Sequence, residues 1–335
     1  MRGRRTEAVR LHRFARTRLT VRFLLQTTVV FVTVFLMATF ITFGLQGLSG
    51  LSPAHLKLSD DATQAQIDEL NHEWGLDRPF VTQYLDWLGA IVHGDLGKSW
   101  YNGAAITELL VDRAAVSLSV ALLALVIGIV AGGVLGGVAA RFHTRWIDRL
   151  ITGFTSLMAI IPAFVVGILL VAVFAATFKL LPAAGYMTIA EGGIGGWLRF
   201  LWLPAIALSF DTVADVARQL RIGLIQAYRE NYVTGAVLRG LSGARIFFVH
   251  VLRNAVGPTL AILGLKFPNL IGGAVVTEAI FGLTGYGQFA AASANRGDVP
   301  AVQGVLVLAI VLVVAFNLLV NVILARLIPA ASRGI

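Results

Sequence analysis

Long apolar stretches alternate with short charged segments along the whole chain. Each stretch holds about 20 residues, enough for a helix to cross the ~30 Å hydrocarbon core of a membrane. The pattern therefore predicts an all-α integral membrane protein with six transmembrane helices. We expect these helices at residues 23–45, 116–140, 150–176, 203–221, 255–281 and 302–324.

The composition agrees with a membrane protein. Of the 335 residues, 57% are hydrophobic and 13% are charged, and the mean hydropathy is +0.80, whereas soluble domains contain roughly 45–50% apolar and ~25% charged residues. Cysteine is absent, which excludes disulfides, thiolate catalysis and cysteine-ligated metal centres. The net charge of +9 comes mostly from basic residues between the apolar stretches. It therefore does not indicate a nucleic-acid partner.

The placement of basic residues predicts which connections face the cytoplasm. Residues 1–22 contain eight arginines, residues 141–149 three and residues 218–253 six, whereas residues 46–113 contain four basic and ten acidic residues. A cleaved signal peptide would have an apolar region of about 7–15 residues and a small-residue cleavage site, and neither fits the first stretch. We expect both termini in the cytoplasm of a bacterial cell, with the protein in its inner membrane.

This sidedness divides the chain into five parts. They are a cytoplasmic basic tail at 1–22, a first span at 23–45, an extracytoplasmic segment at 46–113, a membrane core at 114–327 and a cytoplasmic tail at 328–335. The extracytoplasmic segment contains aromatic residues typical of a membrane interface, so a short helix on the outer surface is expected there. Its role is either membrane anchoring or docking of an extracytoplasmic partner.

Glycine and proline residues predict how the spans pack and bend. Gly128, Gly132 and Gly136 repeat every four residues, and this spacing allows close approach of a second helix. Pro162 and Pro268 each remove a backbone donor within a span, so a kink is expected at both. Such kinks serve either pore shape and gating or only irregular packing.

No catalytic or metal-binding pattern stands out. Gly97-Lys98-Ser99 resembles the end of a phosphate-binding loop, but Val92 stands where that loop needs its first glycine. The six histidines are scattered without metal-ligand spacing. The sequence therefore predicts no enzyme, no metal site and no cofactor in this chain.

The polar stretch at 222–254 carries the most informative motif. A short helix is expected to begin near Tyr228 and to end at Gly240, with a second helix from Arg245. The stretch resembles the cytoplasmic coupling motif of importer-type ABC permeases in the dipeptide, oligopeptide and nickel subfamily. The matching residues are Glu230, Tyr232, Val233, Ala236, Gly240, Leu241, Ser242, His250, Leu252, Arg253, Asn254, Ala255 and Pro258. Further matches lie at 75–79, 93–99, 203–205, 277–281 and 298–304, whereas Gly235 and Leu238-Arg239 depart from the pattern.

The resemblance implies a type I ABC importer permease fold of the MetI-like kind, with an extracytoplasmic insertion after the first helix. It implies a subunit that forms half of a translocation pathway for di- or oligopeptides. The implied partners are a sister permease, two ATP-binding subunits that hold the ATP, an extracytoplasmic solute-binding protein and the lipid bilayer. The residues implied to couple to the ATPase are Glu230, Tyr232, Ala236, Arg239, Gly240 and Leu241. Import of nickel or a metal chelate is the alternative within the subfamily, and an ATP-independent secondary transporter is the alternative outside it.

Charged residues inside the predicted spans form a second candidate site. Asp211 and Asp215 share one helix face, and Lys266 lies at a similar depth in the next span. A charge at the bilayer centre costs about 2.5–3.5 kcal/mol or more unless it is paired or hydrated. We predict that these residues, with Glu278 near the outer end, line the translocation path. For Glu278, a role in structure or in the outer gate is the other interpretation. The alternative is a purely structural Asp–Lys pair, or pairing of Asp215 with Arg218.

Overall fold

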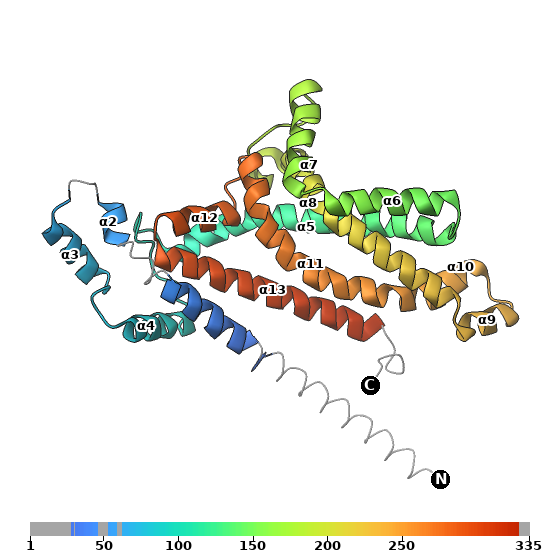
Figure 1. Ribbon diagram of the computed structural model, residues 1–335, viewed down its shortest axis with the longest axis horizontal. Coiled ribbons are helices and arrows are strands. Elements are labelled where there is room, and N and C mark those ends of the chain that lie inside the picture. The colour runs from blue at the N-terminus through green and yellow to red at the C-terminus, as the bar shows by residue number, and fades with distance from the viewer. Residues whose placement is uncertain (1–27, 30, 46–52, 59–61, 328–335) are drawn as a thin grey trace, which may run out of the picture. The chain divides into compact units, whose positions relative to one another are not determined.

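The computed structural model describes residues 28–29, 31–45, 53–58 and 62–327 (Figure 1). The predicted basic tail at 1–22, the start of the first span and the C-terminal tail at 328–335 lie outside this part of the chain. The chain divides into two compact units, Met1–Leu96 and Gly97–Ile335.

The first unit is built around an aromatic cluster. The hydroxyls of Tyr84 and Thr39 lie 2.9 Å apart and form a hydrogen bond, and the Tyr84 ring contacts Phe40 and Phe43 with ring centroids 5.3 and 5.8 Å away. These contacts join the first apolar helix to the amphipathic helix that the sequence predicts after it. The helices of this unit are Phe31–Leu45, α2 (Pro53–Lys57), α3 (Gln64–Glu73) and α4 (Phe80–Val92).

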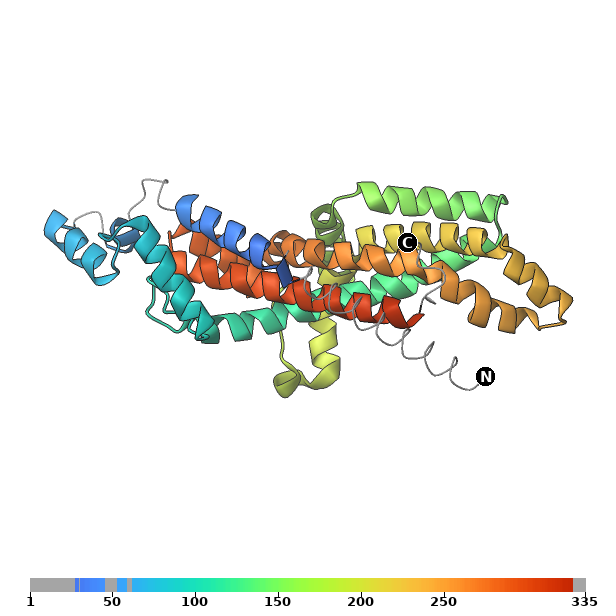
Figure 2. The same ribbon diagram turned by 90° about the horizontal axis from the view of Figure 1, so that it is seen from below.

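The second unit is a bundle of long helices that lie side by side (Figures 1 and 2). Its core lies where α5, α8 and α11 meet, and α8 is the most enclosed of the four long apolar helices among the described residues. In order, the helices are α5 (Ile106–Arg141), α6 (Trp146–Ile160), α7 (Ala163–Leu170), η1 (Val171–Thr177), α8 (Ile189–Tyr228), α9 (Asn231–Leu238), α10 (Gly243–Arg245), η2 (Ile246–Val251), α11 (Leu252–Ile280), α12 (Tyr286–Asn295) and α13 (Val299–Leu327).

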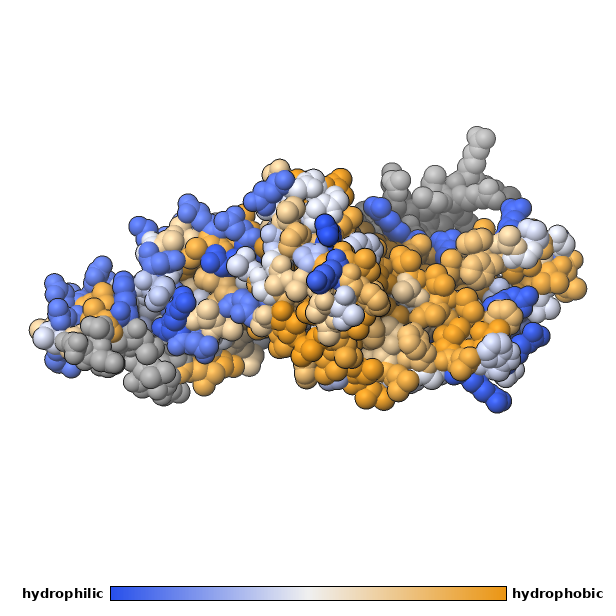
Figure 3. All heavy atoms as spheres, turned by 90° about the horizontal axis from the view of Figure 1, so that it is seen from above, coloured by the Kyte–Doolittle hydropathy of each residue, from blue (hydrophilic) through white to orange (hydrophobic). Residues whose placement is uncertain are grey.

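Several of these helices are longer than the predicted spans. Helix α5 begins at Ile106 instead of residue 116, and α8 covers Ile189–Tyr228 instead of 203–221. The first residues of α5 include Glu108, Asp112 and Arg113, which hydropathy excludes from a span although backbone hydrogen bonding continues through them. Helix α8 has a break at Gly193, with φ 63° and ψ −175°, so its first residues are not continuous with the rest. Figure 3 shows one face of the molecule, where a broad hydrophobic surface is followed by a mixture of hydrophilic and hydrophobic residues at the end that carries α9 and α10.

The number of membrane spans is supported in part. Among the described residues, four helices are long and apolar enough to cross a membrane, and the bent pair α6 and α7–η1 makes five if it forms one span. The helix Phe31–Leu45 is shorter than these, and residues 23–27 and 30, which the sequence assigns to the first span, are not described. The all-helical class is as predicted, while the count of six stays a prediction.

The third span, expected at 150–176 with a kink at Pro162, is divided into two helices. It breaks at Ile161 and Pro162, and the two halves meet at 98°. Proline disfavours helical backbone in the residue before it, and Ile161 is extended, with φ −75° and ψ 119°. The predicted distortion at Pro162 is therefore a sharp corner. Pro258 and Pro268, in contrast, lie inside the continuous helix α11.

The glycine face of α5 packs directly on α8. A Cβ atom on Gly128 would lie 2.4 Å from Thr212 Cγ2, and one on Gly136 would lie 2.5 Å from the carbonyl oxygen of Ala217. Gly137, on the neighbouring face, has no such neighbour within 4 Å. The predicted role in close helix packing is confirmed for Gly128, Gly132 and Gly136.

Replacing Gly136 by Ala is expected to destabilise the bundle by about 1–3 kcal/mol, because the new methyl group meets backbone that cannot rotate away. Gly137→Ala is the matched control and is expected to be neutral or to stabilise by up to about 1 kcal/mol through helix propensity. Thermal unfolding of the two purified variants in detergent measures the difference. Equal stability of both variants would contradict the close contact.

Candidate functional site

The polar stretch at 222–254 contains the short helix α9, which lies between the end of α8 and the helices α10 and η2 that lead into α11. Helix α8 ends at Tyr228, and α9 begins at Asn231 and not near Tyr228 as predicted, because Glu230 takes the extended conformation of an N-cap residue, with φ −73° and ψ 143°. The stop at Gly240 is as predicted: its φ of +73° lies in the region that favours glycine. The amides of Gly240 and Leu241 donate to the carbonyls of Val237 and Ala236 at 2.9 and 3.2 Å, which is the Schellman pattern of a helix end.

Helix α9 has one buried and one exposed face. Val233 and Ala236 are buried in a cluster with residues of α8, η2 and α11, and Leu241 packs against the same cluster. On the opposite face, Leu238 is 82% exposed, and Val237, at the edge between the two faces, is also exposed. Helix α9 thus packs against α8 and α11 on one side and leaves apolar side chains exposed on the other.

The six predicted coupling residues divide between these two environments. Glu230, Tyr232, Arg239 and Gly240 are exposed, Leu241 is half-buried and Ala236 is fully buried. Partial burial raises the pKa of Tyr232 above its usual value, while a hydrogen bond with Asn254 acts in the opposite direction. Ala236 therefore packs the helix against its neighbours, whereas the other five residues are fully or partly accessible.

The charged residues predicted within the spans do meet. The ammonium of Lys266 on α11 lies 2.5 Å from a carboxylate oxygen of Asp211 and 2.5 Å from one of Asp215, both on α8. Asp215 also forms an ion pair with Arg218. Two carboxylates and two cations balance, which compensates the buried charges of Lys266 and Asp215.

Exposure differs strongly within this cluster. The side chains of Lys266 and Asp215 are 11% and 15% exposed, whereas that of Asp211 is 54% exposed. The structural pairing that the sequence left as an alternative is therefore in place. Asp211 remains accessible at one side of the pair.

Glu278 does not join this cluster. It lies twelve residues after Lys266 on α11, about 18 Å along a helix axis, and it is buried. Its carboxylate accepts hydrogen bonds from the Ser117 hydroxyl at 2.5 Å and from the backbone N–H of Gln288 at 2.8 Å. Ser117 in turn accepts the N–H of Tyr286 at 2.8 Å. Glu278 thus holds the turn between α11 and α12 against α5.

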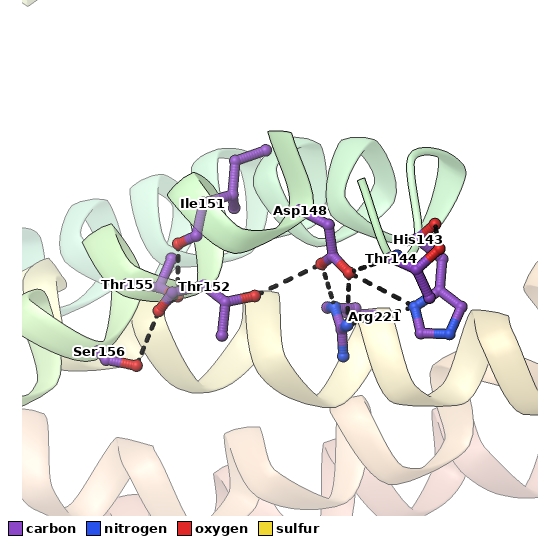
Figure 4. A network of polar contacts seen from close by, with 8 residues as sticks. All are labelled: His143, Thr144, Asp148, Ile151, Thr152, Thr155, Ser156 and Arg221. Atoms are coloured by element: carbon purple, nitrogen blue, oxygen red, sulfur yellow. Dashed lines mark hydrogen bonds and ion pairs between the residues drawn. The ribbon is translucent and has the colours of Figure 1, made fainter. Parts of the chain in front are cut away.

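A further polar network was not predicted (Figure 4). The carboxylate of Asp148, at the start of α6, accepts two hydrogen bonds from Arg221 on α8, at 2.6 and 2.7 Å, and a third from the backbone N–H of Thr144 at 3.0 Å. The ring nitrogen Nδ1 of His143 lies 3.4 Å from the same carboxylate. The network links α6 to α8 near the end of α8 that leads into α9. Its only signal in the sequence was one acidic residue within a basic connection.

Comparison with known families decides the class of protein. The model described as "Binding-protein-dependent transport system inner membrane component" matches residues 124–333, and the model described as "Binding-prot-dependent transport system membrane comp, N-term" matches residues 20–121. The chain belongs to this family of transport permeases. The resemblance inferred from the coupling motif is confirmed.

The permease has relatives of similar length. It is 33% identical over 292 residues to a putative peptide transport system permease protein of Brucella abortus, covering 87% of this chain and 93% of the relative. It is 30% identical over 310 residues to the oligopeptide transport system permease protein AppB of Bacillus subtilis, covering 92% and 98%. It is also 30% identical over 319 residues to the probable D,D-dipeptide transport system permease protein DdpB of Escherichia coli, covering 88% and 92%.

A solved structure shares the fold of the permease core. A chain of the MetNI methionine ABC transporter, in an inward-facing conformation, superposes with a TM-score of 0.54 at 16% identity, covering 67% of this permease and 98% of that chain. At this identity the likeness concerns the fold alone. The MetI-like architecture expected from the sequence is confirmed.

Proposed function

We propose that this permease forms half of the translocation pathway of an ABC importer for di- or oligopeptides and is driven through α9 by separate ATP-binding subunits. The observation that carries the proposal is the two-faced α9, because its buried face is fixed to α8 and α11 while its exposed face offers Val237 and Leu238 to a partner. The peptide substrate is supported by the names of the relatives. The further partners are a sister permease and an extracytoplasmic solute-binding protein.

The packing of α9 suggests how motion would spread. A force on its exposed face reaches α8 and α11 together, since Val233 and Ala236 are buried between residues of both helices. About 20 Å further along α8, counted from Tyr228 to Asp215, Lys266 joins the same two helices. The Asp148–Arg221 contact adds α6 to this group. In our proposal these helices move as one body between inward-open and outward-open states.

The sidedness in this proposal follows from the basic connections. Arg218, Arg229, Arg239, Arg245 and Arg253 lie in or next to the coupling loop, so the positive-inside rule favours α9 and both termini in the cytoplasm. The segment 46–113 then lies outside, where a solute-binding protein would dock. Glu278 would act on the outer gate by fixing the turn that follows α11.

Asp211, Asp215 and Lys266 are proposed to line the path as well as to join two helices. The support is the half-exposed Asp211, which leaves a carboxylate accessible beside an otherwise buried pair. In a pathway for peptides this group would face their ammonium or amide groups. Its separate test is argued in the Discussion.

Reconstitution tests the main proposal. The permease would be expressed with the neighbouring genes of its operon, purified by a tag on this chain and inserted into liposomes. We expect a second permease and ATP-binding subunits to co-purify, and uptake to require ATP, the binding protein and a peptide, with nickel chelates as the competing substrate. A chain that purifies alone and moves solute without ATP would overturn the proposal.

A further inference from the structure

A cavity of about 280 Å³ lies within the second unit, at the end of the bundle away from α9. Its walls come from the loop that precedes α5, from α5 itself, from α12 and from the turns before and after α12. Pockets that enclose whole small ligands measure roughly 300–1,000 Å³. This cavity therefore suits a group about the size of one amino-acid residue.

Two arginines give the cavity a positive charge. The guanidinium of Arg113 lies over the ring of Phe289 at 4.5 Å, and that of Arg296 lies over the ring of Tyr101 at 4.2 Å. Among the residues that the structure describes, neither guanidinium forms an ion pair. Stacking on an aromatic ring fixes the plane of a guanidinium while its N–H groups stay free for an anion.

The acidic residue in the wall forms no ion pair with either arginine among the described residues. Asp298 is buried, and its carboxylate accepts hydrogen bonds from the Ser99 hydroxyl at 2.5 Å and from the N–H of Trp100 at 3.1 Å. These bonds direct it to the loop before α5, where it shapes the wall. Arg113 gives one N–H group to the carbonyl of Leu109 at 2.9 Å and keeps the other donors of its guanidinium.

We propose that this cavity binds a carboxylate through Arg113 and Arg296. Planar guanidinium groups match the two oxygens of a carboxylate, and the bond gains strength because both partners are charged. The inference rests on the proposed function for the side of the membrane and for the two sources of such a group. One source is the C-terminal carboxylate of the transported peptide, and the other is an acidic side chain of the extracytoplasmic binding protein.

Binding is tested first without transport. The purified complex would be treated with phenylglyoxal, which modifies arginine, and the rate at each position read by peptide mapping. N-acetylglycine is the carboxylate probe, N-acetylglycinamide the matched neutral probe, and the exposed Arg145 the internal control. We expect the carboxylate alone to slow modification of Arg113 and Arg296 at least about threefold, as one charge-assisted contact would. Equal rates with both probes would overturn the proposal, and this result is independent of whether the complex transports anything.

The source is then distinguished with Arg113→Gln and Arg296→Gln, using Arg145→Gln as control. If the partner protein supplies the carboxylate, its affinity for the reconstituted complex falls about tenfold in the two variants, with a weaker salt dependence. If the peptide supplies it, that affinity is kept and the preference for free over amidated peptides in uptake is lost. Either result supports the site. The proposed carboxylate site would be rejected if both variants fold, bind the partner and select peptides as the wild type does. This conclusion requires that the wild type itself shows ATP-dependent uptake.

Discussion

Replacing Lys266 by Met is expected to lower the stability of the permease by about 3 kcal/mol, at the lower end of the range for breaking a buried ion pair. Methionine keeps the length and apolar volume of the lysine stem, so the change removes mainly the charge. Asp215, at 15% exposure, then loses one of its two cations and keeps Arg218. Thermal unfolding in detergent, together with ATP-dependent uptake in liposomes, measures both effects.

The stability loss has a sharp control. Lys266→Met combined with Asp215→Asn removes one charge of each sign, so most of the lost stability is expected to return. A double variant as unstable as Lys266→Met alone would mean that the loss of stability comes from the changed shape of the side chain and not from the charge balance. A single variant as stable as the wild type would mean that the pairing contributes nothing.

Asp211→Asn separates transport from stability. Its carboxylate is 54% exposed, and a half-exposed ion pair contributes roughly 0–1 kcal/mol, while Lys266 keeps Asp215 as a partner. If Asp211 faces the path, uptake is expected to fall about tenfold, the loss of one charge-assisted contact, with little change in stability. Full uptake in a variant that is less stable would show the aspartate to be structural.

The sequence could predict a feature of the candidate site only where the residues that form it are close together along the chain or lie at matching depths in two spans. Gly240 ends α9 through a local requirement for positive φ, and Pro162 breaks its helix through local sterics. Both are therefore visible in the residues themselves. The Asp211–Lys266 contact could be foreseen as an alternative, because two spans that run in opposite directions place these residues at similar depth.

Contacts across long stretches of chain gave no such signal. Arg221 and Asp148 are 73 residues apart, and in the sequence both belong to connections counted only for their charge. Ala236 matched the coupling motif, but only the packing of α9 on α8 and α11 shows that it is buried. The cavity with Arg113 and Arg296 depends on the loop before α5 reaching Asp298, 199 residues away along the chain from Ser99.

Replacing Leu238 by Lys is expected to detach the ATP-binding subunits. Leu238 is 82% exposed and lies opposite the buried Val233 and Ala236. A lysine near the end of a helix is favoured by the helix dipole, so α9 should stay folded. In an apolar cleft of a partner, however, the variant loses a buried side chain and introduces an unpaired charge. The loss of such an anchor weakens association by about a hundredfold.

Association of tagged permease with the ATP-binding subunits, and the ATPase activity of the complex, measure this effect. Val92→Lys on α4 is the matched control, because Val92 is 79% exposed and exchanges an apolar side chain for the same charge in the other unit. Leu238→Met should restore binding, since it returns an apolar side chain of similar volume. If Leu238→Lys and Val92→Lys both kept the ATP-binding subunits and normal uptake, α9 would not be the docking element. Loss of the subunits in Leu238→Lys alone would place the coupling contact on the exposed face of this helix.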